Sequence, residues 1–137
     1  MRHFVHASIL CGFLLSCAPM NQRILDTEQS QVQLRSIQSR SFDTGDKERT
    51  LRAVIATLQD LSFVVDKADL PLGTVSATKL DGYALRMTVS VRARSETSVV
   101  VRANAQFNDQ PVTDPQPYQS FFIALERAMF LSANSVD

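Results

Sequence analysis

The side chains best suited to nucleophilic or metal-centred chemistry lie in the first 17 residues. The chain has two histidines, His3 and His6, and two cysteines, Cys11 and Cys17. A Ser-His-Asp or Cys-His site needs a histidine, and zinc sites are built mostly on histidine and cysteine. If the segment before Cys17 is removed and its thiol is modified, only carboxylates, Lys, Tyr, Ser and Arg remain for chemistry.

The N-terminus has the layout of an export signal. Met1-Arg2 gives a positive start, a short apolar run follows, and small Ser16 precedes Cys17. These three features mark a secretory signal. A membrane-spanning helix needs about 20 apolar residues, and this run is shorter and contains His6. We therefore predict that residues 1–16 are a signal peptide.

The residues Leu14-Leu15-Ser16-Cys17 resemble the lipobox of bacterial lipoproteins. In that family the cysteine carries lipid, such as palmitate, and becomes the first mature residue, so the resemblance implies lipidation at Cys17. It also implies sorting to the outer membrane, because Ala18 and not aspartate follows the cysteine. Two alternatives stay open: a plain secretory signal cut after Ala18, which would leave Pro19 beside the cut, and a cytoplasmic protein with an apolar N-terminus.

Length and charge limit the remaining possibilities. Removal of 16 of the 137 residues would leave 121, enough for one domain with its own core. No thiol would remain for a disulfide, so stability must come from burial. The 14 basic residues balance the 14 acidic ones, which argues against a nucleic-acid partner. We expect no cofactor, no metal and no enzymatic activity; a hydrolase using paired carboxylates is the weaker alternative.

Hydrophobic periodicity predicts a single α+β domain over residues 31–132. A polar tether over 17–30 precedes it, and a polar tail over 133–137 follows it. Two segments have helical spacing and several others alternate as strands do. The expected order is a strand over 31–42, a helix over 46–61, a strand over 62–66, a loop over 67–72, strands over 74–79, 83–93 and 99–107, a turn-rich connection over 108–117 and a helix over 117–131.

Two apolar helix faces supply much of the expected core. The first helix begins at Asp46, a favourable N-cap, and the second has its stripe at Tyr118, Phe121, Phe122, Leu125 and Met129. Phe121 and Phe122 could instead face a partner, but core packing is the simpler interpretation. The predicted core is Leu51, Val54, Ile55, Leu58, Leu85, Val89, Val101, Phe121, Phe122 and Leu125.

The two long strands alternate apolar and polar residues, which is typical of an antiparallel sheet with one buried face. A three-residue loop at 95–97 would pair residue 91 with 101 and residue 89 with 103, so that the apolar rows meet. A bulged turn at 80–82, with Gly82 in the left-handed conformation, would pair Val75 with Met87 and Ala77 with Leu85.

A second resemblance lies in residues 58–66 and 72–77. Leu58-Gln59-Asp60-Leu61-Ser62-Phe63-Val64-Val65-Asp66 and Leu72-Gly73-Thr74-Val75-Ser76-Ala77 are similar to helix-grip modules of small bacterial envelope lipoproteins. These include the accessory lipoprotein of the outer-membrane β-barrel assembly machine. The resemblance implies a four- to five-stranded antiparallel sheet with two helices packed on one face. It concerns packing residues and transfers no functional residue.

Four arginines form the candidate binding surface. They share the polar parity of the long strands, which predicts one sheet face that could dock an acidic partner or anionic cell-wall or lipid groups; the simpler alternative is a solvated face. They are Arg86, Arg92, Arg94 and Arg102. Asp66 and Asp69 could suggest calcium, but their spacing matches no EF-hand loop.

These features predict a non-enzymatic accessory or scaffold lipoprotein on the periplasmic face of the outer membrane. Lipid on Cys17 would hold it to the membrane, and an envelope protein would be its partner. The main alternative is a lipoprotein that binds a small ligand or the cell wall in the concavity between the sheet and the last helix.

Overall fold

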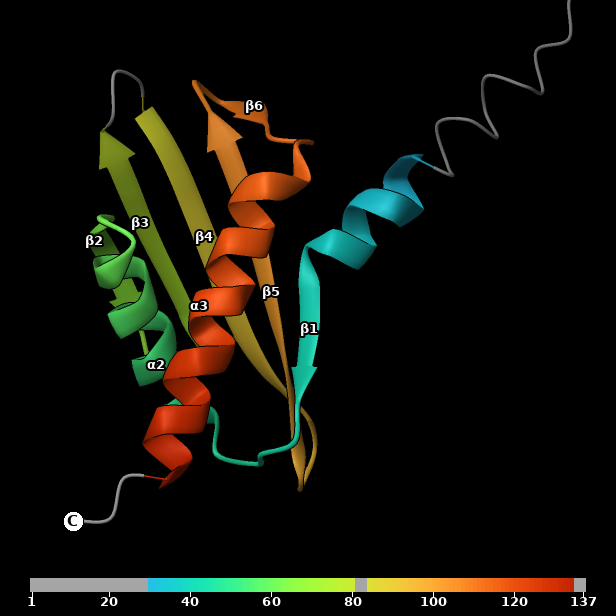
Figure 1. Cartoon of the computed structure of the whole chain (residues 1–137), viewed down its shortest axis with the longest axis vertical. Coiled ribbons are helices and arrows are strands. Elements are labelled where there is room, and N and C mark those ends of the chain that lie inside the picture. Colours follow the sequence, from blue (N-terminus) through green and yellow to red (C-terminus); the bar gives the residue numbers. More distant parts are fainter. Residues whose placement is uncertain (1–29, 81–83, 135–137) are drawn as a thin grey trace, which may run out of the picture.

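The computed structural model describes residues 30–80 and 84–134 as an α+β fold, with one antiparallel sheet and three helical segments (Figure 1). Residues 30–37 are helical and precede the first strand. No helix within the described ranges is long and apolar enough to cross a membrane. The remaining elements are β1 (Ser39–Phe42), α2 (Lys47–Asp60), β2 (Val64–Asp69), β3 (Thr74–Leu80), β4 (Ala84–Ser95), β5 (Ser98–Phe107), β6 (Gln110–Pro111) and α3 (Pro115–Asn134).

The sheet has the strand order β1-β5-β4-β3-β2, and the short β6 pairs with β5 next to β1. It therefore has six strands, where the sequence predicted four to five. The added strand follows from a two-residue turn. Asn108 and Asp109 both have positive φ, 45° and 65°, so that Gln110 pairs with Phe107. Turns with two such residues match the twist of hairpin strands.

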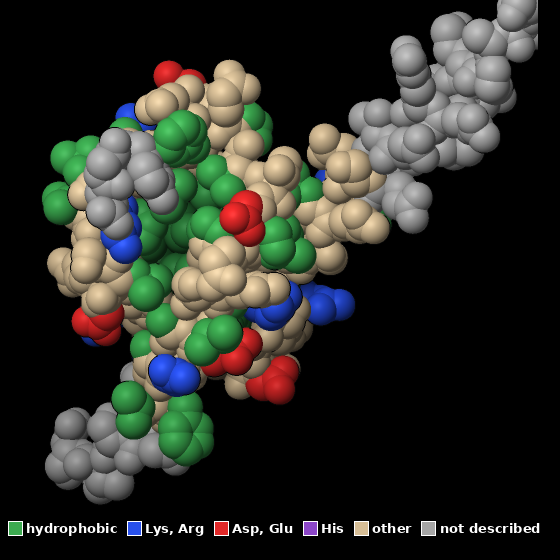
Figure 2. All heavy atoms as spheres, turned by 45° about the horizontal axis from the view of Figure 1, so that its top comes forward, with side chains coloured by type: hydrophobic (Ala, Val, Ile, Leu, Met, Phe, Trp, Pro, Cys, Tyr) green, Lys and Arg blue, Asp and Glu red, His purple; other side chains and the backbone are tan. Residues whose placement is uncertain are grey.

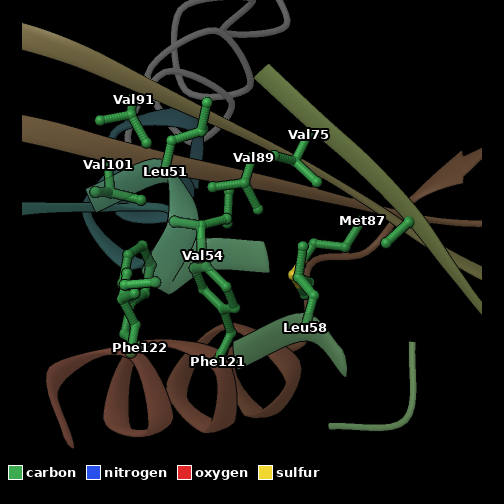
Figure 3. Close-up of a cluster of buried hydrophobic side chains, with 14 of the residues drawn as sticks. Leu51, Val54, Leu58, Val75, Met87, Val89, Val91, Val101, Phe121 and Phe122 are labelled. Atoms are coloured by element: carbon green, nitrogen blue, oxygen red, sulfur yellow. The ribbon is translucent and has the colours of Figure 1, made fainter. Parts of the chain in front are cut away.

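The core is formed by side chains of the sheet strands and of the helices α2 and α3. Figure 3 shows Phe121 and Phe122 of α3 pointing toward side chains of α2 and the strands. Eight of the ten predicted core residues are buried; Ile55 and Leu85 are partly buried. Phe121 and Phe122 are 0% and 1% exposed, so the idea that they face a partner is wrong.

Helix α2 begins and ends through local hydrogen bonds. The Asp46 carboxylate accepts a hydrogen bond of 2.9 Å from the Arg49 N–H, as an N-cap does. At the other end, the N–H groups of Ser62 and Phe63 donate to the carbonyls of Gln59 and Leu58. Ser62 has φ of 67°, and this combination is the Schellman ending of a helix. The expected N-cap is confirmed.

The pairing of β4 with β5 confirms the predicted register, with Val91 opposite Val101 and Val89 opposite Ala103. The turn differs from the expected three-residue loop, because Ser95 pairs with Ser98 and the strand bulges between Ala93 and Ser95. Arg94 is the unpaired residue of this bulge, and Ser95, which was assigned to the loop, is part of the strand.

The predicted register of β3 and β4 is wrong by two residues. Val75 lies opposite Val89 and Ala77 opposite Met87. A shift of two keeps the same side chains on the same face, so all four remain buried. The connection spans residues 81–83, and the predicted Gly82 bulge lies outside the described residues.

Three element boundaries also differ from expectation. The segment 31–42 is not one strand: residues 30–37 are helical and β1 starts at Ser39. The expected loop over 67–72 is wrong in its first half, because β2 continues through Asp69, with Lys67 opposite Ser76. Helix α3 begins at Pro115 and reaches Asn134, so it is longer at both ends than the predicted helix over 117–131 and includes the first two residues of the predicted tail over 133–137.

Candidate functional site

The sheet face that carries the more exposed side chains of the central strands forms the candidate site, and we call it the outer face. Inward side chains such as Val75, Val89 and Val101 are fully buried, while their strand neighbours are partly or fully exposed. This alternation leaves one face of the sheet exposed to solvent. The outward side chains of the three central strands are Thr74, Ser76, Thr78, Arg86, Thr88, Ser90, Arg92, Val100, Arg102, Asn104 and Gln106.

Arg92 and Arg102 lie close together on the outer face. Arg102 of β5 pairs with Ser90 of β4 on one side and with Ser39 of β1 on the other. Arg92 pairs with Val100, two residues from Arg102. Diagonal neighbours of this kind are about 7–8 Å apart. A depression of about 440 Å³ is lined by Ser39, Ser90, Arg92, Val100, Arg102 and Asn104.

Arg94 extends this cationic corner toward β1. It lies in the bulge between Ala93 and Ser95, and its Nη1 donates a hydrogen bond of 3.2 Å to Ser41 Oγ on β1. The side chain therefore reaches across β5, the strand that separates β4 from β1. Bulges redirect side chains next to binding sites in many sheets, and here the bulge coincides with a contact that joins β4 to β1.

Arg86 does not belong to this corner. Six residues separate it from Arg92 along β4, which corresponds to about 20 Å in a strand. It pairs with Thr78 and Gln106, and Thr78 Oγ1 donates to Asp66 Oδ2 at 2.6 Å. The structure therefore brings three of the four predicted arginines together and leaves the fourth at the other end of the strand.

The charges of the outer face are separated. Within the described ranges, none of the four arginines lies within 4.0 Å of a carboxylate, whereas Arg52 forms an ion pair with Glu48 on α2. Asp69 shares a cross-strand row with Arg102 but is three strands away, about 14 Å at ordinary strand spacing. Its carboxylate accepts a hydrogen bond from the Leu72 N–H at 2.9 Å. The corner near β1 is thus cationic, and the β2 edge carries the acids.

This arrangement suits the binding of anions. Guanidinium groups donate pairs of hydrogen bonds to carboxylates and phosphates, and the hydroxyls of Ser39 and Ser90 and the amide of Asn104 line the same depression. The aliphatic stems of arginines also cover apolar surface, here the partly exposed Val100 between Arg92 and Arg102. The corner can therefore hold an acidic group while contacting an apolar one.

A second concavity lies on the helix side of the sheet. Figure 2 shows a hollow lined by hydrophobic side chains beside α3. The sheet register explains why apolar groups are accessible at one end of this side. Beyond the buried residues Met87 and Ala105, the next inward pair is Leu85 and Phe107. Leu85 is partly buried and Phe107 is 39% exposed, so the helices do not fully cover this end.

No family model matches the chain, and no curated protein is significantly similar to it. Cys17, the predicted lipidation site, lies outside the described residues.

The sequence interpretation missed the contribution of β1. Ser39 and Ser41 face the arginines, but residues 31–42 were expected to form one long strand without an assigned neighbour. The alternation of Ser39, Arg40, Ser41 and Phe42 was the available signal, since it separates two outward serines from the more inward Phe42. Nothing local indicates that this short strand pairs with β5, because that pairing joins residues about sixty apart.

Proposed function

We propose that this chain is a bacterial lipoprotein, anchored to the outer membrane by lipid on Cys17 and facing the periplasm. In this proposal it is a non-enzymatic accessory or scaffold component of an envelope complex. Residues 1–16 would be the signal peptide and residues 17–30 the lipidated N-terminus and tether. The lipobox-like sequence Leu14-Leu15-Ser16-Cys17 supports this localisation. With residues 1–16 removed and Cys17 acylated, the chain would carry neither histidine nor free thiol, which supports a binding role over an enzymatic one.

The helix-grip resemblance belongs to the same proposal. We assign α2 and α3 to one face of the sheet in the helix-grip manner, which leaves the outer face free to dock a partner. Antiparallel sheets often expose one face to solvent, so exposure alone would not suggest binding. The observation that carries the proposal is the cationic corner of Arg92, Arg94 and Arg102, which has no carboxylate within ion-pair distance in the described part of the chain.

The proposed partner is an envelope protein with an acidic surface. Complementary charges speed association and fix the orientation of docking. Because these arginines are exposed, binding should weaken as the ionic strength rises. Surface arginines of this kind are also enriched in interface contacts that matter energetically.

The test is affinity capture from detergent-solubilised membranes with the tagged full-length chain. We expect one stoichiometric envelope protein, lost when Arg92→Glu and Arg102→Glu are combined. Arg86→Glu is the matched control, because it reverses the same charge on the same strand and face but outside the corner. Capture that is equally reduced by the control, or unaffected by the double variant, would contradict docking through this corner.

A second candidate is binding of a small apolar ligand on the helix side. The hydrophobic hollow of Figure 2 and the partly exposed pair Leu85 and Phe107 support it. Ligand pockets are mostly apolar and concave. In this case the purified chain would stay alone and retain a lipid detectable by mass spectrometry after extraction.

A further inference from the structure

Helix α3 exposes a second surface, on the side away from the core. Its apolar members Ile123, Phe130 and Leu131 are 51%, 68% and 67% exposed. Glu126 and Arg127 lie between them in sequence, and all five residues line a depression of about 490 Å³. Spacings of three and four residues place them on one stripe of the helix. We call these five residues the α3 stripe.

The two charges of the stripe have no ion-pair partner among the described residues. Glu126 and Arg127 are the charged residues of α3, and the positions three and four residues away from each are apolar. Charges surrounded by exposed apolar side chains favour a partner that supplies both an apolar contact and the opposite charge.

We infer that a second copy of this chain covers the α3 stripe, with the two α3 helices packed antiparallel. If the two-fold axis passes between residues 126 and 127, Glu126 of each copy lies opposite Arg127 of the other. The same register places Ile123 of each copy opposite Phe130 of the other, with Leu131 alongside. A two-fold interface must be self-complementary in this way.

The charge pattern selects this arrangement over others. A parallel two-fold pair would place Glu126 against Glu126 and Arg127 against Arg127, and like charges across an interface are unfavourable. One helix stripe is a small contact area, in the class of weak and transient interfaces below about 1,200 Å². The dimer is therefore weak in dilute solution and strengthens when the chain is concentrated. This inference uses a surface distinct from the cationic corner and does not depend on it.

The first test reverses the charges of Glu126 and Arg127. The mass of the full-length chain in detergent is measured by light scattering over a range of concentrations. Glu126→Arg or Arg127→Glu should weaken dimerisation at least about tenfold, since each creates like-charge contacts worth more than 1.4 kcal/mol. The double variant carrying both changes restores opposite charges in the same register and should recover the dimer. Arg102→Glu, on the outer face, should leave it unchanged.

Cysteine crosslinking tests the register. Full-length chains carrying Ile123→Cys and Phe130→Cys are co-expressed and oxidised in solubilised membranes, with the parent chain showing the background from Cys11 and Cys17. The mixture should yield a disulfide-linked dimer. Either variant alone should yield little, because equal positions are offset by about 10 Å along the helix axis, beyond disulfide reach.

Three results would overturn the inference. They are a chain that stays monomeric at every concentration, single-cysteine variants that crosslink as well as the mixture, and a stripe that crosslinks only to a different protein. Loss of the captured partner in Arg92→Glu with Arg102→Glu, together with retained 123–130 crosslinking, would separate the two surfaces experimentally.

Discussion

At the scale of single residues, the phenol of Tyr118 joins four parts of the fold. The side chain is 0% exposed. Its hydroxyl donates to the Val112 carbonyl at 2.7 Å and accepts from the Ala105 N–H at 3.2 Å and from Gln38 Nε2 at 3.3 Å. On this edge of β5, β1 pairs with residues up to Arg102 and β6 begins opposite Gln106. The hydroxyl therefore satisfies a backbone donor in the gap between two strands.

Replacing this hydroxyl should be costly although the ring stays. We expect Tyr118→Phe to lower the free energy of unfolding by about 1–3 kcal/mol. The reason is that the Val112 carbonyl, the Ala105 N–H and the Gln38 amide each lose a hydrogen-bond partner. Urea unfolding measures the change. The adjacent exposed Gln119 gives the control: Gln119→Ala should stay within about 0.5 kcal/mol of the parent. Equal stability of Tyr118→Phe and the parent would mean that water replaces the hydroxyl.

Leu58 provides a test of the core itself. It is 0% exposed on α2 and lies among the clustered side chains of Figure 3. Leu58→Ala should cost about 2–5 kcal/mol, the range for a buried leucine that leaves a cavity. The next residue, Gln59, is exposed, and Gln59→Ala in the same urea titration should have little effect. A loss below about 0.5 kcal/mol for Leu58→Ala would contradict the burial of Leu58, because even a site that collapses completely loses the transfer free energy of the deleted atoms.

Among single residues, those fixed by burial could be predicted and those fixed by polar contacts could not. The spacing of Leu51, Val54 and Leu58 is sufficient to place them on a helix face, and all three are buried. The role of Tyr118 depends on Gln38, eighty residues away. Periodicity contains no information about such a pairing, because it describes one element at a time.

At the scale of elements, the helix endings show where backbone conformation carries a cost. Ser62 ends α2 with φ of 67°, a conformation that costs an L-residue about 1–2 kcal/mol and glycine little. Glycine also raises the conformational entropy of the unfolded chain, and this cancels about 0.5–1 kcal/mol of the stability gained by relieving the left-handed conformation. We expect Ser62→Gly to raise the free energy of unfolding by up to about 1 kcal/mol.

Thermal and urea unfolding of Ser62→Gly check this expectation. The matched control is Ser62→Ala, which keeps a Cβ in the left-handed conformation and should not stabilise the fold. If both variants destabilise the chain equally, the serine side chain itself matters and the backbone argument is wrong.

Element types were predictable where one periodicity dominated. The apolar stripe of residues 46–61 has a helical repeat only, and α2 follows it closely. Between residues 30 and 42 two repeats compete: Val32 and Leu34 alternate as in a strand, whereas Leu34 and Ile37 have helical spacing. The structure follows the second, since Leu34 and Ile37 are partly buried and Val32 is 62% exposed. Tertiary contact decided between the two.

At the scale of the whole molecule, the shared face of the four arginines and the closeness of two of them were predictable, and the contribution of a third strand was not. The even numbering of Arg86, Arg92, Arg94 and Arg102 on two antiparallel strands places them on one face once the register of β4 and β5 is known. The predicted register also makes Arg92 and Arg102 diagonal neighbours and leaves Arg86 at the far end of the strand. The bulge at Arg94 and the position of β1 were not predicted, and β1 depends on long-range pairing. The sequence could therefore identify the face and two arginines of the corner, but not the contacts of Arg94 and Arg102 with β1.

The proposed localisation at the membrane is also a property of the whole molecule, and it depends on one side chain, that of Cys17. If Cys17 carries the anchor, Cys17→Ser should abolish labelling by radioactive palmitate and move the chain out of the membrane fraction. Each methylene of a membrane-buried acyl chain contributes about 0.8 kcal/mol to binding, so loss of the acyl chains removes most of the affinity. Cys11→Ser is the matched control, because it changes a second cysteine of the predicted signal and should leave labelling unchanged.

The same variant separates anchoring from folding. The buried core begins at Leu51, so we expect any Cys17→Ser chain that is recovered to unfold at the same urea concentration as the parent. A labelled Cys17→Ser chain that remains in the membrane fraction would contradict lipidation at this residue. An unlabelled chain that nevertheless stays with the membrane, and leaves it only when Arg92→Glu and Arg102→Glu are added, would show that docking through the outer face holds the chain there independently of lipid.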